Sequence, residues 1–192
     1  RSLSKTQQEL LQKVDPVMGR VLAKELQGAL PAIALDSHSS LYTAYANDMD
    51  AKVCLAQALQ GYGHPKDVLL AISTSGNSEN ILYAAVTARA FGMPVIALTA
   101  KEGGKLVGLS DIAVRVPQEK TFRAQELHLP IYHCWCRMLE QHFFQLKGEH
   151  MESKIRILNA GYTNLTAQEL LDCLMEDVGK RQKSSVIFLN VD

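Results

Sequence analysis

The feature that most constrains the fold is an alternation of short apolar runs with helical patterns between residues 67 and 116. The run at 67–73, Asp-Val-Leu-Leu-Ala-Ile-Ser, is continuously apolar between its polar ends, as parallel strands covered on both faces tend to be. An amphipathic helical pattern follows it up to Gly92, and two further apolar runs occupy 94–99 and 112–116. Strand, helix and strand in this rhythm predict βαβ units with right-handed crossovers. The chain is therefore expected to form an α/β fold with a parallel sheet.

Further elements are expected on both sides of this region. Two short helices are predicted over residues 4–14 and 17–26, with Ser4 as the N-cap of the first. The apolar run at 31–35 predicts a strand that leads into a polar loop. A long amphipathic pattern over 122–145 predicts a helix that ends the domain.

The order of elements starts again after that helix. A strand, a helix and a strand are expected over residues 155–158, 166–178 and 185–191. We therefore predict one domain over residues 1–147 and a short C-terminal β-α-β extension over 148–192. With its Thr-x-x-Glu helix start and its closing Phe-Leu-Asn-Val-Asp, the segment after Met151 resembles the opening of bacterial glycosyltransferases of the teichoic-acid and enterobacterial-common-antigen type. This resemblance implies the start of a second domain, and a tail that contacts another subunit is the alternative.

The composition excludes several classes of protein. Lys plus Arg and Asp plus Glu each number 20 among the 192 residues, so the formal net charge is zero and offers no general attraction to nucleic acid or anionic membrane. Hydrophobic residues make up 47% and charged residues 21%, a balance that suits a packed core rather than a disordered chain. No apolar stretch approaches the roughly 18 to 20 residues that a membrane helix needs. We expect a cytoplasmic protein without nucleic-acid or membrane partners, in which local groups hold any anionic ligand.

The segment Ser73-Thr-Ser-Gly-Asn-Ser78 is the strongest local signal for a binding site. It lies between an apolar run and an amphipathic helix, whose first N–H groups have no partner within the helix. Hydroxyl groups, a glycine that permits close approach of the backbone and these N–H groups together form a neutral cradle for phosphate. An ordinary N-cap with a polar turn is the alternative, because serine and asparagine favour caps without any ligand. Three serines and a threonine within six residues exceed what a cap needs, so we predict a phosphate site.

Six segments between residues 31 and 133 carry a more specific signal when they are taken in order, within a match that spans about residues 22–145. They read PAIAL (31–35), AND (46–48), HPKDVLLAISTSGNSENI (64–81), ALTAKEGG (97–104), RVP (115–117) and RAQELHLPIYH (123–133). Together they resemble the sugar isomerase (SIS) domain of the phosphoheptose isomerases. The resemblance implies a doubly wound αβα sandwich that assembles as a homotetramer or dimer, with active sites at subunit interfaces. It also implies an isomerase that converts sedoheptulose 7-phosphate to D-glycero-D-manno-heptose 7-phosphate, in heptose supply for surface polysaccharide such as lipopolysaccharide.

The resemblance implies roles for individual residues as well. Contacts with the phosphate or another part of the substrate are implied at Ser73, Thr74, Ser75, Ser78, Asn47, Asp48 and Gln125. Moving a carbonyl along a sugar passes through an enediol, so it needs a base that takes a proton from carbon and an acid that serves the oxygens. By the resemblance, Glu25 is the candidate base and His133 the candidate acid. One Zn²⁺ per subunit, held by Glu25, Gln125 and His133, is an optional cofactor that would polarise the carbonyl.

Ordinary structural roles are the alternative for the same residues. Glu25 fits an exposed position on a short helix, and a single histidine on a helix is more often structural than catalytic. Gln125 and His133 are eight residues apart, about 12 Å along a regular helix, so sharing one metal ion would need irregular geometry near Pro130. His128 is expected on another face of this helix, with little part in catalysis.

Two departures from the family pattern leave another function open. Family members carry a first strand that ends in Gly-Asn-Gly-Gly-Ser, and this sequence contains no Gly-Asn-Gly. They also carry a histidine four residues before the catalytic glutamate, where this chain has Val21, which cannot bind a metal. The alternative to an isomerase is a non-catalytic SIS-domain protein that binds a phosphosugar or regulates another protein, as in one group that helps to initiate chromosome replication. A different sugar phosphate as substrate is also left open, because the phosphate loop does not determine the sugar end.

Overall fold

The computed structural model describes residues 2–144 and the backbone of residues 187–191. The described residues divide into two compact units. The larger unit comprises 31–132 and 187–191, and the smaller comprises 2–30 and 133–144. In the described part of the chain, no helix has the length and apolar character needed to cross a membrane.

The larger unit contains a five-stranded sheet in which all neighbouring strands are parallel. Its strands are β1 (Ala32–Ala34), β2 (Val68–Ile72), β3 (Val95–Ala100), β4 (Ile112–Val116) and β5 (Ile187–Val191). Their order across the sheet is β1-β5-β2-β3-β4. The parallel sheet expected from the apolar runs is thus confirmed.

The last strand of the chain occupies a central position in this sheet. Leu189 of β5 lies opposite Ala34 of β1 on one side and opposite Leu70 of β2 on the other. The strand expected near residues 185–191 therefore belongs to the main sheet and not to a separate one. The strand and helix expected at 155–158 and 166–178 lie outside the described residues, and the domain boundary after residue 147 stays a prediction.

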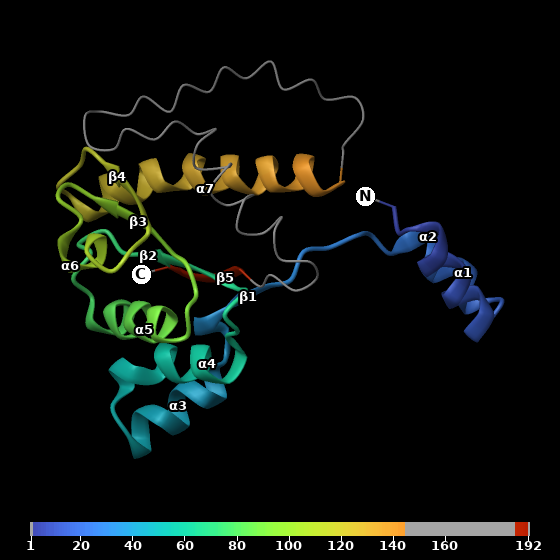
Figure 1. Cartoon of the computed structure of the whole chain (residues 1–192), viewed down its shortest axis with the longest axis horizontal. Coiled ribbons are helices and arrows are strands. Elements are labelled where there is room, and N and C mark those ends of the chain that lie inside the picture. The colour runs from blue at the N-terminus through green and yellow to red at the C-terminus, as the bar shows by residue number, and fades with distance from the viewer. Residues whose placement is uncertain (1, 145–186, 192) are drawn as a thin grey trace. The chain divides into compact units, whose positions relative to one another are not determined.

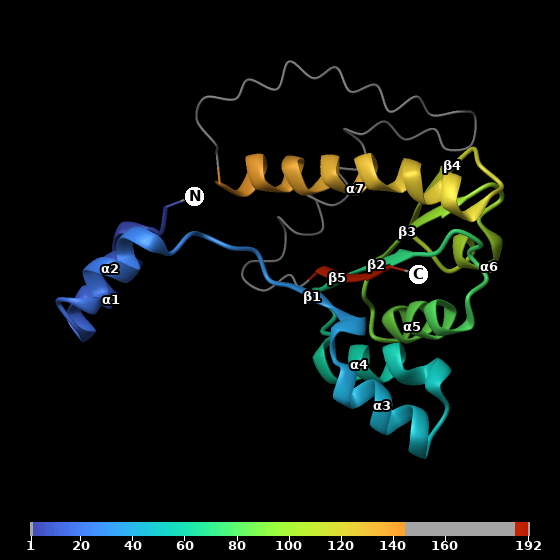
Figure 2. The same cartoon turned by 180° about the vertical axis from the view of Figure 1, so that it is seen from behind.

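Helices cover both faces of the sheet, as Figures 1 and 2 show. On one side lie α4 (Cys54–Tyr62), α5 (Glu79–Ala90) and the short α6 (Gly104–Val107). On the other side lies the first part of α7 (Thr121–Phe144), up to Tyr132. This is the doubly wound arrangement that the resemblance implies.

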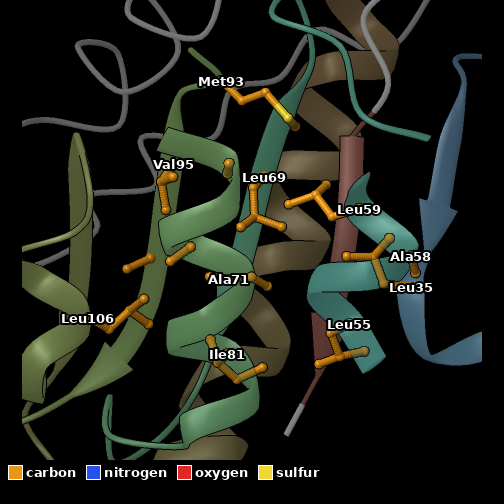
Figure 3. Packing of buried hydrophobic residues seen from close by; sticks show 14 residues of the cluster. Leu35, Leu55, Ala58, Leu59, Leu69, Ala71, Ile81, Met93, Val95 and Leu106 are labelled. Atoms are coloured by element: carbon orange, nitrogen blue, oxygen red, sulfur yellow. The ribbon is translucent and has the colours of Figure 1, made fainter. Parts of the chain in front are cut away.

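The main core forms between the sheet and the first of these helical layers (Figure 3). Successive side chains of a strand point to opposite faces, so Leu69 and Ala71 of β2 face the same way. They pack with Leu59 of α4 and Ile81 of α5. Leu59 has no exposed surface, and burial of a leucine side chain contributes about 1.5–3 kcal/mol. Leu70, on the opposite face of β2, is also buried, which explains why this strand is apolar throughout.

Two helices between β1 and β2 were not expected from the sequence. These are α3 (Ser39–Asp48) and α4, whereas the sequence predicts only a polar loop after the strand at 31–35. None of the residues of α3 is buried, so it carries little hydrophobic periodicity. By contrast, α4 buries Cys54, Leu55, Ala58 and Leu59 at helical spacing, a pattern confined to little more than one turn.

The smaller unit contains the helices α1 (Lys5–Val14) and α2 (Met18–Glu25), which pack against each other. Ser4 caps α1 as expected: its hydroxyl accepts the N–H of Gln7 at 3.3 Å, and the Gln7 side chain accepts the N–H of Ser4 at 3.1 Å. Gly19 is the one buried residue of α2. A Cβ at this position would overlap the backbone of Leu11, so the close contact between the two helices depends on glycine.

His128 on α7 is a buried residue of the fold. Its side chain is only 2% exposed, and its Nε2 donates a hydrogen bond to the carbonyl oxygen of Thr99 at 3.1 Å. The Thr99 hydroxyl in turn donates to the carbonyl oxygen of Thr74 at 3.5 Å. Burial lowers the pKa of His128 below its ordinary value of 6.5, and the hydrogen bond with Thr99 opposes this effect only in part.

We expect His128 to make the fold less stable in mild acid. Because the pKa is lower in the folded state, the unfolded chain takes up this proton first as the pH falls below about 6.5. The free energy of unfolding should therefore be fully retained above that pH and should decline below it. Urea unfolding at pH 7.5 and pH 5.5 should show a smaller decline for His128→Gln than for the wild type. Equal declines in the two proteins would contradict this assignment.

Candidate functional site

The hydroxyl-rich loop at residues 73–78 lies at the carboxyl edge of the sheet. It follows β2, and α5 begins directly after it. The turn that follows β3, residues 101–104, lies at the same edge because the two strands are parallel and adjacent. Ligands of open parallel sheets bind at this edge, outside the carboxyl ends of the strands.

Hydrogen bonds within the loop hold its serines together. The hydroxyl oxygens of Ser73 and Ser78 are 3.1 Å apart, although they are five residues apart in sequence. Ser73 is fully buried, and its hydroxyl accepts the N–H of Gly76 at 3.2 Å. Ser75 is exposed and accepts the N–H of Asn77 at 3.1 Å. The loop therefore curls into a compact turn lined with hydroxyl and backbone N–H groups.

The start of α5 is arranged differently from an ordinary capped helix. Ser78 is the N-cap residue, but its side chain makes no capping hydrogen bond to the helix. Its hydroxyl lies instead beside Ser73 at the base of the loop. The alternative of a simple serine cap thus does not describe this segment, and the first N–H groups of α5 point toward the loop by the geometry of any helix.

Hydrogen bonds link the loop to the segment that follows β3. The N–H of Lys105 donates to Oδ1 of Asn77 at 3.1 Å, and the N–H of Leu106 donates to the carbonyl oxygen of Gly76 at 3.0 Å. Asn77 also bonds the carbonyl oxygen of Ser75 through Nδ2 at 3.1 Å. The 73–78 loop and the start of α6 therefore form one hydrogen-bonded unit.

Glycines allow this close approach. Gly76 has φ of +62° and Gly103 has φ of +74°, values that L side chains rarely adopt. A Cβ on Gly76 would overlap the carbonyl oxygen of Gly103. A Cβ on Gly104 would lie 2.6 Å from Nδ2 of Asn77 and from the carbonyl oxygen of Ser75. The two backbones meet without any space for a side chain between them.

The structure brings together some of the predicted site residues. Ser73, Thr74, Ser75 and Ser78 form the loop just described. Asn47 and Asp48 are the last two residues of helix α3 and are exposed. Their side chains contact each other, with Nδ2 of Asn47 donating to Oδ1 of Asp48 at 3.2 Å.

The remaining predicted residues lie on the helices α2 and α7. Glu25 is the last residue of α2, in the smaller unit, and is exposed with Lys24 Nζ at 3.4 Å from its carboxylate. Val21, one turn earlier on α2, is also exposed. Gln125 and His133 are exposed positions of α7, which is a helix from end to end. Their assembly into one site with the loop stays a prediction.

Among the described residues there is no cluster of three His, Cys, Asp or Glu side chains that could hold a metal ion. Gln125 and His133 are separated by about 12 Å of helix rise, as the sequence spacing implies. Binding of zinc by Glu25, Gln125 and His133 therefore stays a prediction.

Two contributors to the site were missed from the sequence. Asn77 links the loop to Lys105. Gly104 makes room for the loop, because a Cβ there would overlap Asn77 and the backbone of Ser75 and Gly76. The consecutive glycines after a predicted strand were the available signal for such a close approach.

Comparisons with known proteins agree with this geometry. A family model described as the SIS domain matches residues 18–100. A curated phosphoheptose isomerase from Alkalilimnicola ehrlichii is 44% identical over 118 residues, which is 60% of this chain and 60% of that protein. One from Coxiella burnetii is 42% identical over 125 residues, 64% of this chain and 63% of that protein. The matched region thus spans less than two thirds of these relatives.

Solved structures give the same result. The structure of a phosphoheptose isomerase from Francisella tularensis has 32% sequence identity and a TM-score of 0.57, covering 71% of this chain and 82% of that one. The phosphoheptose isomerase from Neisseria gonorrhoeae has 36% identity and a TM-score of 0.55, covering 57% of this chain and 61% of that one. The strand-loop-helix site, the family model and these relatives together show that the chain belongs to the SIS-domain family of phosphoheptose isomerases.

Proposed function

We propose that this protein isomerises sedoheptulose 7-phosphate to D-glycero-D-manno-heptose 7-phosphate and so supplies heptose for surface polysaccharide. The observation that carries the proposal is the hydroxyl-lined loop at 73–78, clasped by the Lys105 and Leu106 N–H groups at the carboxyl edge of the sheet. Such a loop suits the 7-phosphate group, which anchors the substrate while chemistry proceeds at C1 and C2. The relatives named phosphoheptose isomerase support this choice of substrate.

Removing two hydroxyl groups should weaken substrate binding. Ser75 is exposed on the loop, and Ser78 lies at its junction with α5, so both can reach a bound phosphate. Ser75→Ala combined with Ser78→Ala is expected to weaken binding of sedoheptulose 7-phosphate by about 2 to 6 kcal/mol, at roughly 1 to 3 kcal/mol per hydrogen bond to a charged group. Titration calorimetry measures this loss, and unchanged affinity would rule out the loop as the phosphate site.

Within this proposal, Glu25 removes a proton from C1 of the ketose, and His133 serves the oxygens of the resulting enediol. Return of the proton to C2 then gives the aldose. A carboxylate at the end of α2 and an imidazole on α7 have the chemistry for these roles. The proposal includes completion of the site by a neighbouring subunit.

Zinc binding by Glu25, Gln125 and His133 is part of the proposal as an optional feature. Their oxygen and nitrogen donors are types that Zn²⁺ accepts, and the ion would polarise the substrate carbonyl when bound. No step above depends on it, because the described residues do not assemble a metal cluster. We also propose a cytoplasmic location, which the free thiols of Cys54, Cys134 and Cys136 support, since cytosolic thiols stay reduced.

Self-association into a homotetramer or dimer is also proposed. The helices α1 and α2 expose apolar side chains that include Leu10, Val14, Val17, Met18, Val21 and Leu22. Val14 is 88% exposed and Val17 is 67% exposed, so contact with a second copy would remove a substantial apolar area from water. Sedimentation velocity at micromolar concentration should show an oligomer that Val14→Asp with Val17→Asp weakens. A wild-type monomer would contradict this part of the proposal.

The competing function is a non-catalytic phosphosugar-binding or protein-binding regulator. Val21, exposed and without a metal-binding group, is the observation that favours it. NMR in deuterated water separates the two functions, because an isomerase exchanges the C1 proton of sedoheptulose 7-phosphate with solvent. Absence of exchange, even with added zinc, would leave the regulator as the better assignment.

A further inference from the structure

An ion pair lies directly beside the 73–78 loop. Lys52 belongs to a single 3-10 turn, Ala51–Val53, that contacts α5. Oδ1 of Asp50 accepts the N–H of Lys52 at 2.9 Å and fixes this turn. The ammonium group of Lys52 then pairs with the carboxylate of Glu79. Both side chains are about half exposed, at 56% and 53%.

Glu79 adjoins the loop in the chain. It is the first residue of α5 and follows Ser78, the last residue of the loop. A carboxylate at this position favours the helix, because it interacts well with the positive end of the helix dipole. The same charge repels any second anion at the same helix end. Since the loop itself supplies only neutral hydroxyl and N–H groups, an uncompensated Glu79 would oppose phosphate binding.

We propose that Lys52 is a specificity-determining residue of the phosphate site, which neutralises Glu79 and lets the loop accept a phosphate dianion. This inference rests on the proposed function, because it assigns a role within the same site. The hydrogen bond and charge of Glu79 raise the pKa of Lys52, so the ammonium group stays protonated at neutral pH.

Two other cations of the described part have ion-pair partners of their own. Lys101 pairs with Glu119 at 2.7 Å, and Arg89 lies in the last turn of α5 with Asp111 at 3.4 Å. Arg89 is therefore on the same helix as Glu79 but about 15 Å away along its axis. Arg89→Met removes a paired surface cation without touching the loop, which makes it the matched control.

Calorimetric titration of the full chain with sedoheptulose 7-phosphate, and separately with inorganic phosphate, tests the inference. Lys52→Met should weaken binding about tenfold at low salt, because the unpaired carboxylate of Glu79 then repels the bound phosphate dianion. The effect is limited to this size because the pair is half exposed and water screens the repulsion. The loss should shrink at higher ionic strength. Lys52→Arg should restore most of the affinity. Glu79→Gln should strengthen binding about threefold or more, and the double variant should lie close to the wild type.

The outcomes separate this inference from the function on which it rests. If the wild type binds and Lys52→Met behaves like Arg89→Met, the role of Lys52 is wrong while the phosphate loop stands. If the wild type binds neither ligand, the phosphate loop and the role of Lys52 both fail. Thermal unfolding of each variant checks that the half-exposed substitutions leave the fold intact.

Discussion

Replacement of Gly76 by alanine is expected to disrupt the phosphate loop and lower the stability of the fold. The residue has φ of +62°, and the new Cβ would overlap the carbonyl oxygen of Gly103. A left-handed conformation costs a non-glycine residue about 1–2 kcal/mol, and overpacking adds about 1–3 kcal/mol. The free energy of unfolding should therefore fall by about 2–5 kcal/mol. Because the two backbones must move apart by on the order of 1 Å, affinity for sedoheptulose 7-phosphate should fall by about two orders of magnitude.

Gly92 supplies the matched control for this prediction. Its φ is +71°, close to that of Gly76, but a Cβ there would meet nothing within 4 Å. Gly92→Ala should lose only the conformational part, about 1–2 kcal/mol, and should keep wild-type affinity. Urea unfolding and calorimetry of both variants separate backbone strain from the clash. Equal behaviour of the two alanine variants would show that the approach of Gly103 to the loop is not tight.

The parts of the fold that were predictable from sequence are those with a strong local signal. The strands β2 and β3 are buried on both faces, so nearly every position is apolar, with Thr99 as the exception, and the runs stand out. The helix α5 begins after a run of serines, and α7 is long enough for its pattern to be read in spite of Pro130. In these segments, the local sequence pattern and the burial in the folded protein favour the same secondary structure.

Other parts depend on partners far away in the sequence. The central position of β5 follows from pairing with β1 and β2, which lie more than a hundred residues earlier. No local pattern specifies which strands a given strand will join. No residue of α3 is fully buried, and only Leu41 of this helix packs partly buried against the main core, so its sequence carries little signal for a helix.

In the candidate site, too, only features formed by residues close together in the sequence were predictable. Its three serines lie within six residues of the chain, so their convergence was predictable from composition and from the helix that follows. The clasp between Asn77 and Lys105 joins residues 28 positions apart and was not predictable. The ion pair of Lys52 with Glu79 spans 27 positions and was missed for the same reason.

Substitution of Glu25 by glutamine is expected to have the largest effect on turnover. Glutamine keeps the size and hydrogen-bonding shape of the side chain but cannot accept a proton at neutral pH. Loss of a general base typically lowers the rate by about two to four orders of magnitude. Because Glu25 is exposed at the end of α2 and pairs only loosely with Lys24, the substitution should leave the fold unchanged. Affinity for sedoheptulose 7-phosphate should survive, since the phosphate loop is not altered.

Exchange of the C1 proton in deuterated water, followed by NMR, measures this loss directly. Glu9→Gln is the matched control, because Glu9 is an exposed glutamate on the neighbouring helix α1 and has no proposed role. It should exchange the proton at the wild-type rate, whereas His133→Gln should be slowed because the acid is lost. If Glu25→Gln exchanges as fast as Glu9→Gln, the base lies elsewhere in the chain. In that case Glu25 has no role in catalysis. Another carboxylate or histidine near the carboxyl edge of the sheet must then take the proton.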